Sequence, residues 1–332
     1  MNENGTEMAE SVGENIRKTA WLRDARWGVL MHFLTEPETT SEEWNRKVDN
    51  FDVDTLADQL ADVGAGYFFI TLGQGSGHYC APNETYDRIT GISPSKCSRR
   101  DLVSDLHAAL SSRDIALMAY VPADGSWADH EARRQLKLTA HWGDDSDHDW
   151  QRGPHWSRYR LPEFQEKWEA VCRDWSLRFG DKVGGWWVDG AYAREYRYPK
   201  NDPPNLRTYA DALRAGNPDA LVAFNPGVNT PVVAYSEYED FTAGEISRAL
   251  PECPGGFVET DNGHRELYHV LTYLGTSWGR GEPRFPEALV KGYTRHITAK
   301  GGIITWDVPF KPDGTIEKPF LQQLRAMDNV LN

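Results

Sequence analysis

The feature that most constrains the fold of this chain is a regular alternation of short apolar runs with segments of helical periodicity. In the intervening segments apolar residues recur at spacings of three and four, which gives each helix one apolar stripe. Strands that alternate with helices build parallel sheets, and eight such units close into a barrel. The sequence therefore predicts an α/β fold, a single (β/α)8 TIM-type barrel. The expected strands are 27–33, 66–72, 115–121, 183–189, 220–225, 234–241, 256–260 and 301–307, of which 234–241 fits the pattern least well.

The length of the chain agrees with one barrel. Its 332 residues exceed the roughly 250 that this fold typically uses, and no linker or low-complexity stretch divides them. We expect residues 1–20 to form an N-terminal tail or short helix and residues 21–332 to form the catalytic barrel, with no C-terminal β-sandwich. The long polar segment 122–160 follows a strand and is expected on the face that carries the site.

Composition narrows the classes of partner. With 50 acidic and 36 basic residues the formal net charge is −14, which repels phosphate backbones and anionic lipids, so neither nucleic acid nor a membrane is an expected partner. The N-terminus has no signal-peptide core and no apolar run is long enough to span a bilayer, which predicts a cytoplasmic protein unless a leader was removed. The four cysteines lie far apart and are expected to be reduced. The sequence predicts no particular oligomeric state.

Polar and aromatic side chains follow the expected strands at the points where the strands end. In a β/α barrel the loops after the strands form the cup that holds a substrate. Sugars suit such a cup, because their flat C–H faces stack on aromatic rings and their hydroxyls need polar partners. The candidates for binding a sugar are His32, Gln74, His78, Tyr120, Trp127, Trp187, Asn225, Trp278 and Trp306.

Three carboxylates are candidates for the chemistry. Asp189 ends the apolar strand 183–189, where an ionisable side chain is costly without a partner or a use. Glu245 and Glu259 each follow a late strand, so either can face Asp189 across the cup. Cleavage of a glycosidic bond usually takes two carboxyl groups, which this set can supply. A structural ion pair is the alternative role for each of the three.

Metal and nucleotide sites are not indicated. His264 and His269 are five residues apart and no His-x-x-x-His or clustered His and carboxylate pattern occurs, so we expect no metal and no other cofactor. The segment 73–77, Gly-Gln-Gly-Ser-Gly, lacks the spacing of the phosphate-binding glycine motifs and leads into His78 instead of a helix. We interpret it as a loop in which glycine lets the backbone approach a ligand.

The segments WGVLMHF, FDVDTLADQLADVGAGYFFITL, RRDLVSDLHAALSSRDIALMAYV and GGWWVDGAY follow one another along the chain. In this order they resemble the α-L-fucosidases of glycoside hydrolase family 29. WGVLMHF resembles the first strand of that family, FDVDTLADQLADVGAGYFFITL its helix and second strand, and RRDLVSDLHAALSSRDIALMAYV the next helix and third strand. GGWWVDGAY resembles the strand that carries the nucleophile, with Asp189 at the position of that residue. FVETD, TSWG and GGIITWDVPFKPDGTI resemble the last part of the barrel.

The resemblance implies a retaining exo-glycoside hydrolase that works by double displacement. Asp189 is then the nucleophile, Glu259 in the Glu-Thr stretch is the acid/base, and Glu245 in DFTAGE is the second choice for that role. Two segments differ from the family where it holds fucose: His-Trp-Gly of the first strand is His32-Phe33-Leu34, and His-His-Asp-Gly-Phe of the second is replaced by residues 74–79.

The expected substrate is an oligosaccharide or glycoside. Because the differing segments hold the sugar, its glycone can be fucose, another deoxy sugar, a galactoside or a pentoside. A barrel that binds glycans without cleaving them is the alternative from another class.

Overall fold

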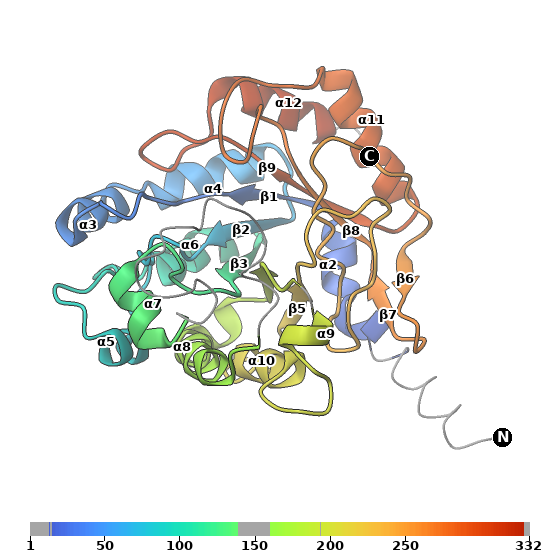
Figure 1. Ribbon diagram of the computed structural model, residues 1–332. Coiled ribbons are helices and arrows are strands. Elements are labelled where there is room, and N and C mark those ends of the chain that lie inside the picture. Colours follow the sequence, from blue (N-terminus) through green and yellow to red (C-terminus); the bar gives the residue numbers. More distant parts are fainter. Residues whose placement is uncertain (1–12, 14, 139–159, 193, 329–332) are drawn as a thin grey trace.

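The protein folds into a parallel β/α barrel (Figure 1). The computed structural model describes residues 13, 15–138, 160–192 and 194–328. Seven strands form one sheet in the order β5-β4-β3-β2-β1-β9-β8, and every pairing in it is parallel. The first five expected strands and the last are thereby confirmed. The seven strands are β1 (Trp27–Met31), β2 (Tyr67–Thr71), β3 (Ala116–Pro122), β4 (Gly185–Asp189), β5 (Leu221–Phe224), β8 (His269–Tyr273) and β9 (Ile303–Asp307).

Helices cover the outer side of the sheet (Figure 1). Several begin at a polar side chain that caps a free backbone N–H: Asp52 accepts from Thr55, and Asp101 accepts from Ser104. The helices are α2 (Ala20–Ala25), α3 (Ser41–Asp49), α4 (Val53–Asp62), α5 (Glu84–Thr90), α6 (Leu102–Ser111), α7 (His130–Leu136), α8 (Pro162–Phe179), the 3-10 turn η4 (Gly180–Lys182), α9 (Arg194–Arg197), α10 (Leu206–Leu213), α11 (Glu287–Ala299) and α12 (Lys318–Asp328). The apolar residues that recur at spacings of three and four in α4, α6 and α8 are buried, as predicted.

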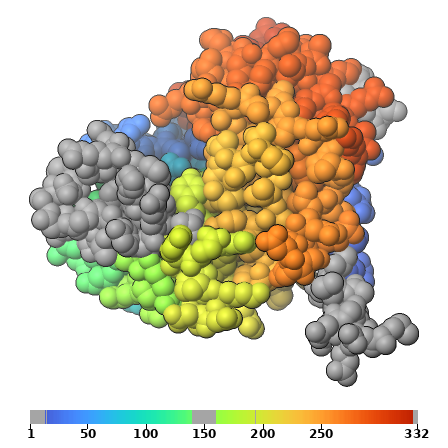
Figure 2. Space-filling view, turned by 45° about the vertical axis from the view of Figure 1, so that its right-hand side comes forward, coloured from blue at the N-terminus to red at the C-terminus, as the bar shows by residue number. Residues whose placement is uncertain are grey.

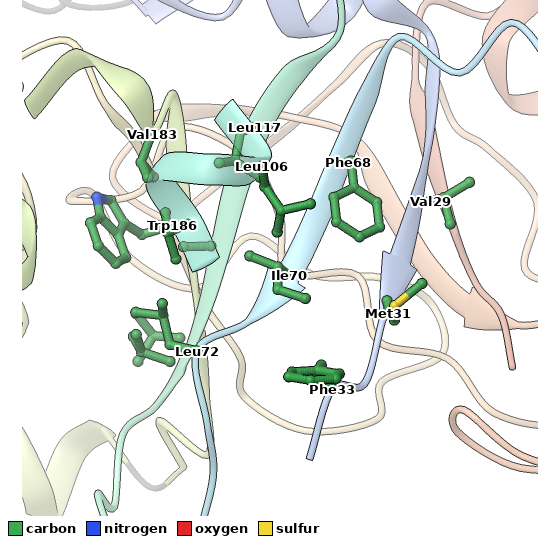
Figure 3. Close-up of a cluster of buried hydrophobic side chains, with 14 of the residues drawn as sticks. Val29, Met31, Phe33, Phe68, Ile70, Leu72, Leu106, Leu117, Val183 and Trp186 are labelled. Atoms are coloured by element: carbon green, nitrogen blue, oxygen red, sulfur yellow. The ribbon is translucent and has the colours of Figure 1, made fainter. Parts of the chain in front are cut away.

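Each strand presents alternate residues to two different cores. One set points outward and packs against the helices, for example Val29 and Met31 of β1 beside Phe68 and Ile70 of β2 (Figure 3). The other set fills the barrel interior. The inward set includes Leu30, Tyr67, Phe69, Met118, Tyr120, Trp187, Leu221, Ala223, Leu271 and Ile303. This alternation decides which side chain at each strand end faces the cup.

The sixth position of the barrel is filled by residues 240–246, not by the expected strand at 234–241. On one side this segment pairs in parallel with β7 (Arg265–Leu267) and β8. Phe241 forms a bridge with Leu267 of β7, and Glu245 forms one with Leu271 of β8. Toward β5 only one backbone bond forms, from the N–H of Asp240 to Val222. Carboxylates bind the next free N–H groups of β5: Asp240 accepts from Val222 (2.8 Å) and Glu239 from Phe224 (2.6 Å). Side chains thus replace part of a strand ladder, and the run does not form a regular strand.

The expected strand at 256–260 is present, but its place as the seventh strand of the barrel is wrong. It forms β6 (Phe257–Glu259), which pairs antiparallel with β7 in a separate two-stranded sheet. The seventh barrel strand is β8, which is buried along most of its length, whereas β6 is partly exposed at every residue. The turn 261–263, Asp-Asn-Gly, is a hairpin signal in the sequence that accounts for this arrangement.

The N-terminal segment packs at the amino ends of the strands. Leu22 of α2 joins the interior core, the side-chain amide of Asn15 donates to the carbonyl of Asp240 (3.2 Å), and Lys18 pairs with the Asp240 carboxylate (3.0 Å). The four cysteines are free and buried, as predicted. None of the helices in the described ranges combines the length and apolarity needed to cross a bilayer.

Candidate active site

A cavity of about 640 Å³ opens at the carboxyl ends of the barrel strands. Substrates of β/α barrel enzymes bind at this end of the fold. The cavity brings together seven of the side chains predicted for the site, and Asn225 lies directly behind it, bonded to two of them. Its lining consists of Leu30, His32, Leu34, Thr35, Glu36, Lys47, Gln74, Tyr120, Trp187, Asp189, Glu245, Leu271, Ser277, Trp278, Gly279, Arg280, Phe310, Lys311 and Pro312.

Asp189 lies in this cavity at the end of β4 and is bound by three donors. It points inward because it shares its face of the strand with Trp187, two residues earlier. The Tyr120 hydroxyl donates to Oδ2 (2.5 Å) and the Gln74 amide approaches the same oxygen (3.4 Å). The Asn225 amide donates to Oδ1 (2.9 Å). These bonds fix the carboxylate in one direction and stabilise its negative charge.

Glu245 is joined to Asp189 through Asn225. The same amide nitrogen of Asn225 donates to Glu245 Oε2 (2.6 Å), while the amide oxygen accepts from the N–H of Gly227 (3.0 Å) and so fixes the orientation of the amide. Burial, followed by the negative charge of Asp189, raises the pKa of Glu245 to about 7, although the Asn225 bond and His32 act in the opposite direction. Glu245 therefore holds its proton in slightly acid solution.

A histidine and an aromatic ring form another wall of the cavity. His32 follows β1, and its ring lies 5.6 Å from the ring of Trp278. Its Nδ1 is 2.7 Å from Oδ1 of Asp307, the last residue of β9. Burial lowers the pKa of His32, but the negative charges of Asp307, Asp189 and Glu245 prevail and raise it above its usual value.

Trp187 and Tyr120 form an aromatic floor. Their rings stack with centroids 5.4 Å apart and an interplanar angle of 20°. The Trp187 indole N–H donates to the carbonyl of Ala243 in the sixth segment (2.9 Å), which attaches β4 to the segment that carries Glu245. The two rings therefore connect β3 and β4 to the segment that carries Glu245, and this holds both candidate carboxylates in place.

Three predicted sugar-binding side chains are not brought to the cavity. His78 is buried against Trp44 (ring centroids 5.9 Å), and burial lowers the pKa of His78 to about 4. Trp127 packs so closely on Gly75 that a Cβ there would lie 2.3 Å from its indole. Trp306 points outward from β9 and its N–H donates to Thr294 of α11 (3.0 Å).

Glu259 also lies away from Asp189. It belongs to β6, its side chain is 62% exposed, and it forms an ion pair with Arg265 across the hairpin (3.3 Å). It lines a second, separate surface pocket together with residues of α9, and the space-filling view shows the hairpin beside that part of the surface (Figure 2). Its expected place at the end of a barrel strand was wrong because β8, not β6, occupies that position in the barrel.

Sequence reasoning did not select Asp307 for the site, although strand alternation contains the signal. Residues 303, 305 and 307 of β9 share one face, and Ile303 belongs to the interior core. Trp306, which is predicted to bind the sugar, lies on the opposite face of β9 and faces the helices. Three further lining residues were not predicted for the site: Lys47, which lies on α3, and Arg280 and Lys311, which lie in loops. Among the described residues no group of three His, Cys, Asp or Glu side chains has the arrangement of a metal site.

Known proteins match this chain at the level of structure. No family model and no curated protein matches the sequence. The endo-fucoidan hydrolase P5AFcnA from glycoside hydrolase family 107 superposes with a TM-score of 0.67 at 14% identity, over 94% of this chain and 92% of that one. The endo-fucoidan hydrolase MfFcnA4 of the same family gives 0.71 at 17% identity, over 95% of this chain and 54% of that one.

A second group of matches consists of α-L-fucosidases. Isoenzyme 1 from Paenibacillus thiaminolyticus gives a TM-score of 0.64 at 15% identity, over 95% of this chain and 75% of that one. The chain thus spans about half the length of MfFcnA4 and three quarters of this fucosidase. At these identities the comparisons show a shared β/α barrel fold.

Proposed function

We propose that this protein is a retaining glycoside hydrolase of fucose-containing glycosides, with Asp189 as the nucleophile and Glu245 as the acid/base. The structural matches support the substrate class, since they include α-L-fucosidases and endo-fucoidan hydrolases. The residues of the cavity support the mechanism. Glu245, the second choice, takes the acid/base role that the resemblance implies for Glu259, because Glu245 lines the cavity with Asp189 and Glu259 does not.

The observation that carries the proposal is the bridge through Asn225. One nitrogen donates to Asp189 Oδ1 at 2.9 Å and to Glu245 Oε2 at 2.6 Å, so the two oxygens are at most about 5.5 Å apart. Retaining glycosidases hold their carboxyl groups about 5–5.5 Å apart, and inverting enzymes need more than about 6.5 Å to fit a water molecule. The upper limit for this pair of oxygens lies below the separation that an inverting pair needs, and this supports direct attack by Asp189 over attack by water.

The reaction then runs in two displacements. Asp189 attacks the anomeric carbon while protonated Glu245 gives its proton to the glycosidic oxygen, so the bond to the leaving group breaks and a glycosyl ester of Asp189 forms. Glu245, now a carboxylate, takes a proton from water as that water attacks the same carbon. The ester breaks, the sugar leaves with its original anomeric configuration, and both carboxyl groups regain their starting charges.

The other cavity residues suit a sugar between these two groups. Trp278 and Trp187 offer aromatic surfaces for C–H faces, and His32 offers a hydrogen-bonding nitrogen for a hydroxyl. Tyr120 and Gln74 act mainly on Asp189, since both bind its carboxylate, and Gln74 also donates to the Tyr120 hydroxyl (2.5 Å). The substrate is therefore bound by its faces and hydroxyls.

The test combines substrates with product stereochemistry. The purified protein is incubated with nitrophenyl α-L-fucoside, a panel of other nitrophenyl glycosides and fucan oligosaccharides, beside the Asp189→Ala variant. We expect Asp189-dependent release from a fucoside or fucan, with the α anomer as the first product seen by NMR. Release from another glycoside alone overturns the fucose assignment, a β anomer overturns the retaining mechanism, and no Asp189-dependent release from any substrate overturns the hydrolase.

A matched trapping experiment identifies the nucleophile. A 2-deoxy-2-fluoro fucosyl fluoride forms the ester but slows its hydrolysis, so peptide mass spectrometry should find the sugar on the peptide that contains Asp189. Label on any other residue, or on the Asp189→Ala protein, contradicts the role given to Asp189.

A further inference from the structure

Asp307 is fully buried at the end of β9 and binds two neighbouring elements at once. Its Oδ1 accepts from Nδ1 of His32, after β1, at 2.7 Å, and its Oδ2 accepts from the backbone N–H of Gly279, after β8, at 2.5 Å. β9 lies between β1 and β8 in the sheet. Asp307 therefore joins two walls of the cavity without lining the cavity itself.

Both walls contain a side chain to which we give a role in sugar binding. His32 has one ring nitrogen occupied by Asp307, so only Nε2 remains for a ligand. Gly279 follows Trp278, whose ring stands 5.6 Å from the His32 ring. Gly279 has φ +60, and a Cβ there would lie 3.1 Å from Cβ of His32, so the loop and the histidine are in close contact. A shift of the carboxylate would therefore move both.

The charges around His32 favour one state of its ring. Carboxylates face it from three elements, Asp307 on β9, Asp189 on β4 and Glu245 in the sixth segment, and the Tyr120 ring of β3 lies 6.0 Å away. Their combined effect raises the pKa of His32. With Nδ1–H bound to Asp307 the ring presents Nε2 to a ligand, where the imidazolium donates a hydrogen bond and the neutral ring accepts one.

We propose that Asp307 is a positioning residue that orients His32 so that its Nε2 forms a hydrogen bond with a sugar hydroxyl, and that holds the Trp278 loop beside it. This inference rests on the proposed function, because it gives His32 and Trp278 a bound sugar. Asp307 touches no reacting atom and acts through its two neighbours. Misplacement of a binding group by about 1 Å can cost on the order of 100-fold in rate, so the effect is large enough to measure.

The kinetic test is a double-variant cycle with the substrate that the wild type cleaves. Asp307→Asn keeps the shape of the side chain but removes its charge and one of its acceptors. We expect kcat/KM to fall about 10- to 100-fold, mostly through KM, because the bond to the sugar is lost. His32→Gln should cost a similar factor, and the double variant should cost no more than the larger single loss, since both changes remove one function. Losses that multiply, or a single loss below about twofold, overturn the proposal.

An independent readout uses no substrate and separates this proposal from the proposed function. The imidazole signals are followed by NMR against pH, and His32 is identified by the signal missing from His32→Gln. In Asp307→Asn the pKa of His32 should fall, because its nearest negative charge is gone. Asp313→Asn, which removes an exposed carboxylate of the following turn, is the matched control and should leave the titration unchanged.

The outcomes of the two readouts are distinct. An unchanged His32 titration in Asp307→Asn overturns the positioning role even if the enzyme is active. A wild type that cleaves no glycoside overturns the proposed function, and then only the titration judges Asp307. If Asp307→Asn does not fold, as judged by thermal unfolding, Asp307→Glu keeps the charge and displaces it, and it should lower kcat/KM while His32 retains its raised pKa.

Discussion

Two pairs of carboxyl groups lie at or beside the sixth segment of the barrel, and they differ in what surrounds them. Asp189 and Glu245 meet at the cavity and share the amide of Asn225. Glu239 and Glu266 lie just before that segment and in β7, and both are almost completely buried. Each pair contains a carboxyl group whose pKa is raised by burial and by a neighbouring negative charge. The chemical environments are alike, but only the first pair reaches a cavity.

The enclosed pair has a structural role. Glu239 accepts from the N–H of Phe224 (2.6 Å) and Glu266 accepts from the N–H of Tyr235 (3.1 Å), so each satisfies a backbone group that has no strand partner. Their Oε2 atoms are buried with no hydrogen-bond partner among the described residues. A raised pKa therefore identifies a desolvated carboxyl group, and access to a cavity is the additional property that makes such a group a candidate catalyst.

The largest expected effect is on the cavity pair. Asp189→Ala should lower kcat/KM by at least about 10⁴-fold, because no ester can form, whereas Glu266→Gln should leave it within a few-fold. Rates are measured on the substrate found for the wild type, with thermal unfolding as a check that both variants fold. Equal losses in the two variants would remove the distinction between the pairs.

Glu245→Gln should lower kcat/KM by about 10²- to 10⁴-fold and change its pH dependence. The acid must be protonated to work, so wild-type activity should fall as the pH rises through the pKa of Glu245, about 7. The variant has no such proton and should lack this fall. Its loss should be smaller with a nitrophenyl leaving group, which departs without a proton, than with an alkyl glycoside. An alkaline limb that persists in the variant would assign the limb to another group.

The enclosed pair, Glu239 and Glu266, should affect the pH dependence of the free energy of unfolding. Burial and the charge of Glu239 raise the pKa of Glu266 well above its ordinary 4.5, so the folded state holds a proton that the unfolded state releases. This contribution is fully present below about pH 4.5 and is lost as the pH rises toward the folded value. Glu266→Gln cannot ionise and should be more stable than the wild type by about 1–3 kcal/mol at pH 8, with a smaller difference at pH 5. Urea unfolding of both proteins at pH 5 and pH 8 measures this difference in the free energy of unfolding. A difference that does not change with pH would show that Glu266 is ionised when folded.

Periodicity predicted most of the fold because most strands carry their signal in consecutive residues. β1 to β5 and β9 are short apolar runs between helices with clear stripes, and all six lie where the sequence placed them. The sixth position was misplaced because carboxylates from 239 and 240 substitute for backbone acceptors there, and the apolar pattern does not record such bonds. The seventh was missed because β6 and β8 are both apolar runs, and only the turn between β6 and β7 distinguishes a hairpin from a barrel strand.

The same limit applies to the site. Asp189, His32, Tyr120 and Trp187 were found because they end strands that the sequence located and share the inward face. Strand alternation places Asp307 on the inner face of β9 and Trp306 on the outer face, so the prediction of Trp306 as a sugar-binding residue is wrong. Asn225 connects Asp189 of β4 to Glu245 of the sixth segment, although these residues are distant in the chain. The spacing of residues along the sequence does not predict such contacts across the barrel.

The smallest expected effect belongs to Glu259, the glutamate that resemblance placed in the acid/base role. Its side chain is mostly exposed and its ion pair with Arg265 is of the surface kind, worth at most about 1 kcal/mol. Glu259→Gln should leave kcat/KM within about twofold and shift the free energy of unfolding by less than about 0.5 kcal/mol. Glu259→Gln and Glu245→Gln are measured in one assay. The two glutamates both follow apolar runs in the sequence, but only Glu245 lines the cavity with Asp189. A large loss in Glu259→Gln with little in Glu245→Gln would mean that the β6–β7 hairpin moves to the cavity when substrate binds, and the acid/base would then be Glu259.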